Sequence, residues 1–226
     1  MKEFKIGVLG FGTVGAGVVE CLLTNGDLMA ARIGIRPVLA RIADLDITTD
    51  RGVKVPDGIL TTDANEILNS DDIDVVVELI GGTSIAKTFM MQAINNGKSV
   101  VTANKALLAY HGDEIFSAAE ANGVDVFYEA STAGGIPIIK ALREGLAANR
   151  IESIYGILNG TCNYILTRME NEGIAFDTVL AEAQALGYAE ADPSFDIDGD
   201  DTAHKTVILN ALAFGTWCGM DKVYMS

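Results

Sequence analysis

Three glycines in the segment GFGTVG, at positions 10–15, stand between a short apolar run and a stretch with helical spacing. The run Lys5–Leu9 ends in glycines, which predicts a buried strand. Apolar residues then recur at helical intervals over Val14–Leu23, and the expected buried face consists of Val14, Val18, Cys21 and Leu22. Residues 24–34 predict a loop. A strand that passes through a glycine turn into a helix is typical of the first unit of a parallel α/β sheet.

The GxGxxG spacing in this context predicts a dinucleotide site. Gly10 permits a tight turn, Gly12 lets the backbone approach a pyrophosphate, and Gly15 lets the helix pack closely on the strand. The start of the helix offers N–H groups and the positive end of its dipole to the phosphates. The alternative is a glycine-rich turn without a ligand. The residues expected to contact the cofactor here are Gly10, Phe11, Gly12, Thr13, Val14 and Gly15.

Strand and helix patterns alternate over the N-terminal part of the chain. The run DVVVELI at 74–80 is apolar without alternation, as in strands of a parallel sheet that are buried on both faces. A helix is predicted near 85–96, and further strands are predicted at 99–102 and 125–129. We therefore expect an α/β fold, with a Rossmann-type doubly wound parallel sheet in an NAD(P)-binding domain over residues 1–130.

Beyond Ser131 the pattern changes, which predicts a second, α+β domain over residues 131–226. Its one predicted strand is Ile151–Leu158, and helices are expected near 163–171, 176–186 and 202–214. A lone strand cannot form a sheet, so its partners must come from further sequence or from another chain. We expect this domain to bind substrate, to form a dimer and to be incomplete in the chain.

The charge and the cysteines of the chain narrow its partners and its compartment. The formal net charge of -15 argues against nucleic acid and anionic membranes as partners, because both would repel the chain. The three cysteines are widely spaced, which favours neither a disulfide framework nor a CxxC metal site. We expect a reduced, cytoplasmic compartment. No stretch approaches the ~18 apolar residues that a membrane helix needs.

A second strand is predicted at Pro37–Ile42, and two charged residues near its end bear on the choice of cofactor. An acid at this place binds the ribose hydroxyls of NAD, whereas an arginine accommodates the 2′-phosphate of NADP. Asp44 would favour NAD and Arg41 would favour NADP, and either could instead be a solvated surface charge. The sequence favours Asp44 slightly and leaves the choice between NAD and NADP open.

Lys105, in the segment TANKALLA, follows the end of a predicted strand, where ligands bind in open α/β sheets. Asn104 is expected to cap the next helix, which places Lys105 beside the positive end of the helix dipole. A lysine placed against this local preference indicates function, and a solvated surface lysine is the alternative. The residues expected to contact the cofactor at this edge are Gly81, Thr102, Asn104 and Lys105.

The segment 187–201 is rich in carboxylates, which must be solvated or bind a cation. It lacks the glycine and glutamate of a calcium-binding EF-hand loop. Asp201 and Lys205 are four residues apart, so they share one face of the predicted helix, at its exposed first turn. Such a pair can transfer a proton, although spacing alone favours an ordinary surface ion pair.

Taken together, the motifs resemble the homoserine dehydrogenase family over essentially the whole chain. The matching segments are GFGTVG, VVVELIGG, TANKALLA, YEASTAGGIPII, GILNGTCNYIL and GYAEADPSFDIDGDDTAHK, in this order. The first is shared by many dehydrogenases, and the last two are highly specific. The resemblance implies an NAD(P)-dependent interconversion of L-aspartate 4-semialdehyde and L-homoserine, in threonine, methionine and isoleucine biosynthesis.

The resemblance also implies roles for the matched positions. Lys205 matches the catalytic lysine, Asp201 supports it, and Lys105 matches a second lysine near the nicotinamide and substrate. Glu190 and Asp196 match the acids that hold the amino group of the substrate. The pocket would be completed by Asn159, Gly160, Thr161, Gly187 and Tyr188. A monovalent cation, sodium or potassium, would be held by the backbone carbonyls of Glu129, Thr132, Gly134 and Ile136.

Family members continue beyond the last residue of this chain, and the resemblance implies a homodimer. The chain is therefore expected to be incomplete, which puts its activity alone in doubt. Two other functions are considered. A semialdehyde dehydrogenase would use Cys162 as its nucleophile, which requires a lowered thiol pKa. A dinucleotide-sensing module without catalysis would not need Lys105, Asp201 and Lys205 together.

Overall fold

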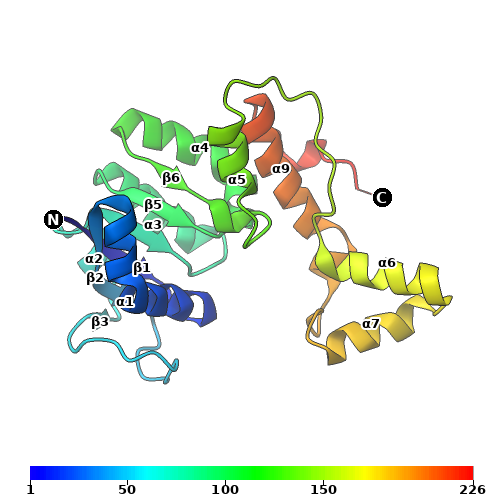
Figure 1. The fold of residues 1–226 in the computed structure, drawn as a ribbon, viewed down its shortest axis with the longest axis horizontal. Coiled ribbons are helices and arrows are strands. Elements are labelled where there is room, and N and C mark those ends of the chain that lie inside the picture. Colours follow the sequence, from blue (N-terminus) through cyan, green and yellow to red (C-terminus); the bar gives the residue numbers. More distant parts are fainter. Residues whose placement is uncertain (226) are drawn as a thin grey trace. The chain divides into compact units, whose positions relative to one another are not determined.

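Six parallel strands form the sheet of the first of two compact units, which comprises Met1–Ser131. The structure is a computed structural model that describes residues 1–225 (Figure 1). The strand order is β3-β2-β1-β4-β5-β6, and every adjacent pair is parallel. The strands are β1 Lys2–Leu9, β2 Ile35–Ala43, β3 Leu60–Thr61, β4 Val75–Glu78, β5 Ser99–Thr102 and β6 Val126–Phe127. This order confirms the expected Rossmann-type sheet, whose direction of winding reverses between β1 and β4.

Helices connect the strands of the first unit. They are α1 Thr13–Ile33, α2 Asn65–Leu68, α3 Ser84–Asn95 and α4 Lys105–Asn122, followed by a 3-10 turn at Glu129–Ser131. Helix α1 packs on β1 and β2, whereas α3 packs on β4, β5 and α4. Such layers bury the central strands, and Val76 and Val77 of β4 are both buried, as expected for an apolar strand without alternation.

Two expectations about the first helix were wrong. Helix α1 continues through the segment predicted as a loop and ends at Gly34, which has a positive φ of 76°. The weak helix formers in this segment predict a loop, but Ala30 is buried, and this tertiary packing stabilises the helix there. The expected buried face was also rotated, because Val14 is 58% exposed and Ala16 and Val19 are buried instead.

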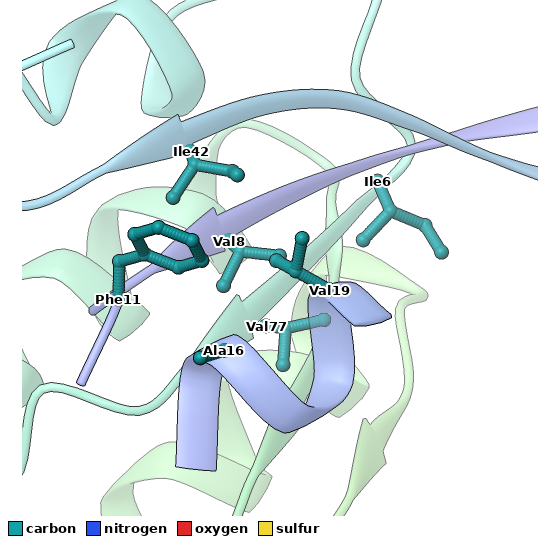
Figure 2. Packing of buried hydrophobic residues seen from close by; sticks show 7 residues of the cluster. All are labelled: Ile6, Val8, Phe11, Ala16, Val19, Ile42 and Val77. Carbon is teal, nitrogen blue, oxygen red and sulfur yellow. The ribbon is translucent and has the colours of Figure 1, made fainter. Parts of the chain in front are cut away.

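The core between α1 and the sheet explains that rotation (Figure 2). A Cβ atom at Gly15 would lie 2.0 Å from the carbonyl oxygen of Gly10, so this residue brings the helix directly onto the glycine turn. The following turn then places Ala16 and Val19 on the sheet. The cluster consists of Ile6, Val8, Phe11, Ala16, Val19, Ile42 and Val77.

The second unit begins at Thr132 and is helical in the part that the structure describes. Helices α6 and α7 form a hairpin with a small core of Ile165, Val179, Ala183 and Ala189. Helix α9 buries Val207, Ile208 and Leu209. The elements are α5 Ile138–Lys140, a π-helical turn at Ala141–Gly145, α6 Gly160–Glu172, α7 Phe176–Ala185, α8 Ser194–Ile197, α9 Asp200–Phe214 and a 3-10 turn at Met220–Lys222.

The strand predicted at Ile151–Leu158 does not form within residues 1–225. A strand requires backbone partners on a neighbouring strand, and the described part of this unit provides none. The side chains of the segment remain in solvent, with Tyr155 91% and Ile157 74% exposed. Helix α8 also interrupts what was expected to be a continuous polar loop at 187–201.

Candidate active site

The glycine turn has the geometry that a pyrophosphate site needs. Gly10 has a φ of +98°, and a Cβ atom there would lie 2.7 Å from the backbone of Leu79. Gly12 is the N-cap of α1, and a Cβ atom there would meet nothing within 4 Å. The turn is therefore tightly packed on the protein side at Gly10 and open at Gly12, where α1 presents its first N–H groups.

Asp44 is hydrogen-bonded to the glycine turn, directly after the end of β2. Its Oδ2 atom accepts a hydrogen bond of 2.5 Å from the backbone N–H of Phe11, and its Oδ1 atom accepts one of 2.8 Å from that of Asp46. A cavity of about 200 Å³ opens beside it, at the carboxyl ends of β1, β2 and β4. Its lining includes Gly10, Asp44, Thr62, Asp63, Asn65, Ile80 and Phe89.

Arg41 is directed elsewhere. Its guanidinium forms an ion pair with the carboxylate of Glu66 on α2, which also accepts a hydrogen bond of 2.8 Å from the hydroxyl of Thr61. Arg41 lines a different hollow, together with Ser70 and residues of β1 and β2. Of the two residues considered for the choice of cofactor, Asp44 therefore lies at the cavity beside the glycine turn.

The carboxyl ends of β4 and β5 are connected by side chains. Glu78 Oε2 accepts a hydrogen bond of 2.6 Å from the hydroxyl of Thr102, and both residues are buried. Asn104 caps α4 by accepting from the backbone N–H of Leu107, and its amide donates to the carbonyl of Gly82 at 2.7 Å. Lys105 is the first residue of α4, as predicted.

Sequence reasoning did not select Glu78. The signal was an acidic residue at the end of an otherwise apolar run, VVVE, at a strand end where ligands bind.

In the second unit, Asp201 and Lys205 form a buried pair. Lys205 Nζ donates to Asp201 Oδ2 and to the carbonyl of Leu158, both at 2.6 Å. The side chains of Asp201 and Lys205 are 6% and 17% exposed, so the expectation of an exposed first turn was wrong. The side chains of an ordinary surface ion pair would be far more exposed to solvent than these. The partners of Lys205 are therefore polar groups of the protein.

Asn159 brings a second carboxylate to this pair. It is the N-cap of α6, where its Oδ1 atom accepts from the N–H of Cys162. Its Nδ2 amide donates to Asp196 Oδ1 at 2.7 Å and to Asp201 Oδ2 at 2.8 Å. One amide thus holds two acids close together, which lowers the repulsion between them.

The remaining predicted pocket residues lie at the start of α6 and in the segment after α7, and their side chains differ in exposure. The hydroxyl of Thr161, next to Gly160 at the start of α6, donates to the carbonyl of Tyr188 at 2.8 Å. The ring of Tyr188 is exposed and meets that of Tyr164 edge-on. Gly187 has a positive φ of 77°, and Glu190 is exposed.

Cys162 has the wrong electrostatics for a nucleophile. Burial raises the pKa of the Cys162 thiol, and the charges of Asp196 and Asp201 raise it further. Its Sγ atom lies 3.2 Å from the carbonyl oxygen of Asp196, which the S–H group can use as an acceptor. A nucleophilic cysteine needs a lowered pKa, so this environment opposes a thioester mechanism.

The predicted carbonyl ligands of a monovalent cation fall on both units, with Glu129 in the first and Thr132, Gly134 and Ile136 in the second. Thr132 is buried, and its hydroxyl oxygen has no hydrogen-bond partner among the described residues. Within the same residues, no group of three or more His, Cys, Asp and Glu side chains is arranged to hold a metal ion.

A Rossmann-type sheet with an open glycine turn is typical of the class of dinucleotide-binding proteins. Family models extend this to both units: the homoserine dehydrogenase NAD binding domain matches residues 10–129, and homoserine dehydrogenase matches residues 137–226. The chain belongs to the homoserine dehydrogenase family.

Individual relatives agree with the family models. The homoserine dehydrogenase of Neisseria gonorrhoeae is 53% identical over 225 residues, covering 100% of this chain and 52% of the relative. That of Pseudomonas aeruginosa is 51% identical over 226 residues, covering 99% and 51%. A solved homoserine dehydrogenase from Thiobacillus denitrificans superposes with a TM-score of 0.93 at 52% identity, covering 100% of this chain and 52% of that one. The chain spans about half the length of the curated relatives it matches.

Proposed function

We propose that the protein is a homoserine dehydrogenase, which interconverts L-homoserine and L-aspartate 4-semialdehyde with a nicotinamide cofactor in threonine, methionine and isoleucine biosynthesis. The observation that carries the proposal is the hydrogen-bonded cluster of buried Asn159 and Asp201 with half-buried Asp196 and Lys205, in a chain that also has the glycine turn. A non-catalytic dinucleotide sensor would not need a buried lysine–carboxylate pair, because burying charges is unfavourable without a role for them.

Lys205 is the group we assign to the proton of the substrate hydroxyl. Its ammonium has three N–H groups, and the contacts with Asp201 and Leu158 use two of them. We assign the third to the substrate oxygen: the ammonium gives up this proton as the carbonyl is reduced, and the neutral amine accepts the hydroxyl proton as the carbonyl forms. A bound nicotinamide supplies or accepts the hydride. Lys105 would lie near the same oxygen.

The acids of the second unit bind the other end of the substrate. Homoserine carries an α-ammonium group, so a carboxylate pair is the expected recognition element. Asp196 and Glu190 are assigned to this group, while Asp201 remains with Lys205. Asn159 holds Asp196 and Asp201 at a fixed separation, and Gly160, Thr161, Gly187 and Tyr188 complete the proposed pocket.

For the cofactor we propose that Asp44 selects NAD over NADP. A 2′-phosphate bound at the cavity beside the glycine turn would approach the carboxylates of Asp44 and Asp63, which would repel it. Arg41 cannot offset this repulsion while it is paired with Glu66. A hyperthermophilic archaeal homoserine dehydrogenase, 28% identical to this chain, was solved in complex with NADPH.

We further propose a monovalent cation at the carbonyls of Glu129, Thr132, Gly134 and Ile136. The buried hydroxyl of Thr132, which lacks a partner among the described residues, supports a bound polar ligand in this segment. Rates measured in sodium, potassium and a large organic cation at equal ionic strength test this. Equal rates in all three would contradict the proposal.

We also propose a cytoplasmic homodimer formed through the second unit. The support is the segment Ile151–Leu158, in which Ile154, Tyr155 and Ile157 are exposed and which pairs with no strand among the described residues. Light scattering of the full-length protein tests the dimer, and a monomer at micromolar concentration would contradict it. Among the described residues, no helix is both long enough and apolar enough to cross a membrane.

The proposed activity is tested by initial rates with homoserine and each dinucleotide, measured on this chain and on the full-length protein. Turnover by the full-length protein that needs homoserine and no added phosphate supports the assignment. The absence of turnover with either cofactor would contradict it. Phosphate-dependent oxidation of a semialdehyde that is lost on thiol alkylation would instead favour the Cys162 mechanism.

A further inference from the structure

Glu78 is a buried carboxylate that no proposed step uses. It is the last residue of β4, which lies between β1 and β5, and its exposed fraction is 0%. Because it is fully buried, it cannot contact substrate or cofactor directly. Burying a carboxylate is unfavourable unless several donors satisfy it, and an apolar residue would pack at this position without that requirement.

The donors to Glu78 come from two places at the carboxyl edge of the sheet. Its Oε1 atom accepts from the backbone N–H groups of Ile80 at 2.9 Å and Gly81 at 3.3 Å. Its Oε2 atom accepts from the hydroxyl of Thr102, the paired residue on β5, at 2.6 Å. One carboxylate therefore holds the turn after β4 and the end of β5.

The network continues from Thr102 to the start of α4 and back to the turn. The hydroxyl oxygen of Thr102 accepts from the backbone N–H of Asn104 at 3.0 Å, and so its hydrogen is directed to Glu78. The amide of Asn104 donates to the carbonyl of Gly82, which closes the ring of contacts. Lys105 is the next residue, so the ring sets the position from which its side chain starts.

We propose that Glu78 is a positioning residue, which fixes the turn Ile80–Gly82 and the Lys105 backbone relative to each other for hydride transfer. The proposal rests on the proposed function for the reaction itself. The turn has positive φ at Gly81 and Gly82, so local conformation alone does not hold it in one arrangement. Hydride transfer depends on the alignment of the reacting groups, so the backbone segments around them must be held in fixed positions.

The first test is the kinetics of Glu78→Gln in the full-length protein. Glutamine keeps an acceptor for Ile80 and Gly81 and places an amide group, a donor, against the hydroxyl of Thr102. We expect kcat to fall about 10²-fold with the KM for homoserine unchanged, because misalignment affects the chemical step. The primary deuterium isotope effect on kcat, measured with homoserine labelled at its hydroxyl-bearing carbon, should increase.

Three further variants separate positioning from loss of stability. Thr102→Val removes the hydroxyl and should reproduce the Glu78→Gln phenotype, whereas Thr102→Ser, which keeps the hydroxyl, should recover turnover relative to valine. Lys98→Met is the matched control. Lys98 is buried directly before β5, at the opposite edge of the sheet, and donates to the carbonyls of Ser70 and Ile73, which precede β4. The substitution should lower the unfolding temperature and leave kcat unchanged.

A binding measurement keeps this inference separate from the assignment of homoserine as substrate. In the wild type, NADH should slow amide exchange both in the turn Ile80–Gly82 and at Asn104–Leu107, and in Glu78→Gln this joint protection should be lost. Wild-type kcat in both Glu78→Gln and Thr102→Val, an equal loss of kcat in Lys98→Met, or unchanged joint protection would overturn the proposal. A wild type that shows joint protection without turnover of homoserine refutes the proposed function alone.

Discussion

On α9, the ammonium nitrogen of Lys205 lies 2.6 Å from Oδ2 of Asp201, one helical turn before it. The same carboxylate oxygen accepts from Asn159, which in turn holds Asp196. The spacing alone favours an ordinary surface ion pair, whose other hydrogen-bond partners would be water molecules. The observed geometry is different. Here the other partners are a carbonyl and an amide of the protein.

Substitution of Lys205 tests its role in proton transfer. We expect Lys205→Ala in the full-length protein to lower kcat by about 10²–10⁴-fold, the usual contribution of general acid–base catalysis. Lys205→Arg keeps the charge but cannot release a proton at a usable pH. Steady-state kinetics and NADH titration check both variants. Recovery of the rate by arginine would limit Lys205 to an electrostatic role.

Substitution of Asn159 distinguishes its two tasks. Asn159→Ser keeps an N-cap for α6 but removes the amide that holds Asp196 and Asp201. We expect a rise in the KM for homoserine and a loss of stability, because Asp196 and Asp201 lose the donor that they share. Asn159→Ala also loses the cap, which should destabilise the protein by about 1 kcal/mol. Thermal unfolding and KM are the measurements, and an unchanged KM in both variants would contradict the assignment.

A matched pair of glycine variants tests the dinucleotide site. A side chain at Gly12 meets open space in the protein, so Gly12→Val should fold normally and lose NADH binding, because valine occupies the space of the pyrophosphate. A Cβ at Gly15 meets the carbonyl of Gly10, so Gly15→Ala should lower the unfolding temperature. Tight NADH binding by a folded Gly12→Val protein would disprove the site.

Asp44→Asn tests the preference for NAD. Removing the charge should weaken NAD binding by about tenfold, the effect of losing roughly 1.4 kcal/mol from a charge-assisted contact. It should strengthen NADP binding, because one of the two carboxylates that repel the 2′-phosphate is neutralised. Arg41→Gln is the control, because Arg41 is paired with Glu66 away from the cavity. Fluorescence titration of each cofactor measures both effects. A larger loss of NADP binding in Arg41→Gln would transfer the choice of cofactor to that residue.

The raised pKa of Cys162 makes a prediction about its reactivity with pH. The thiolate is the reactive form, and a raised pKa moves its appearance to higher pH than for an ordinary thiol. Iodoacetamide should therefore label Cys162 more slowly than exposed Cys21 near neutral pH, and the difference should shrink as pH increases. Peptide mass spectrometry follows each site. Faster labelling of Cys162 at neutral pH would restore it as a candidate nucleophile.

Local patterns were sufficient for the features that depend on residues close together in sequence. The glycine spacing predicted the turn and the start of α1, and Asn104 predicted the cap of α4 that places Lys105 in its first turn. The apolar run of β4 predicted a central parallel strand. These features follow from backbone conformation, capping and periodicity, which a few neighbouring residues determine.

Tertiary structure decided the contacts between distant residues. Asn159 donates hydrogen bonds to Asp196 and Asp201, which lie 37 and 42 residues away in the sequence. Glu78 on β4 accepts a hydrogen bond from Thr102 on the neighbouring strand β5. The ion pair with Glu66 determines where Arg41 points. Periodicity shows which face of an element is apolar, but the partner of a polar side chain depends on how elements pack. The same holds for Ile151–Leu158, because a strand forms only where another backbone accepts its hydrogen bonds.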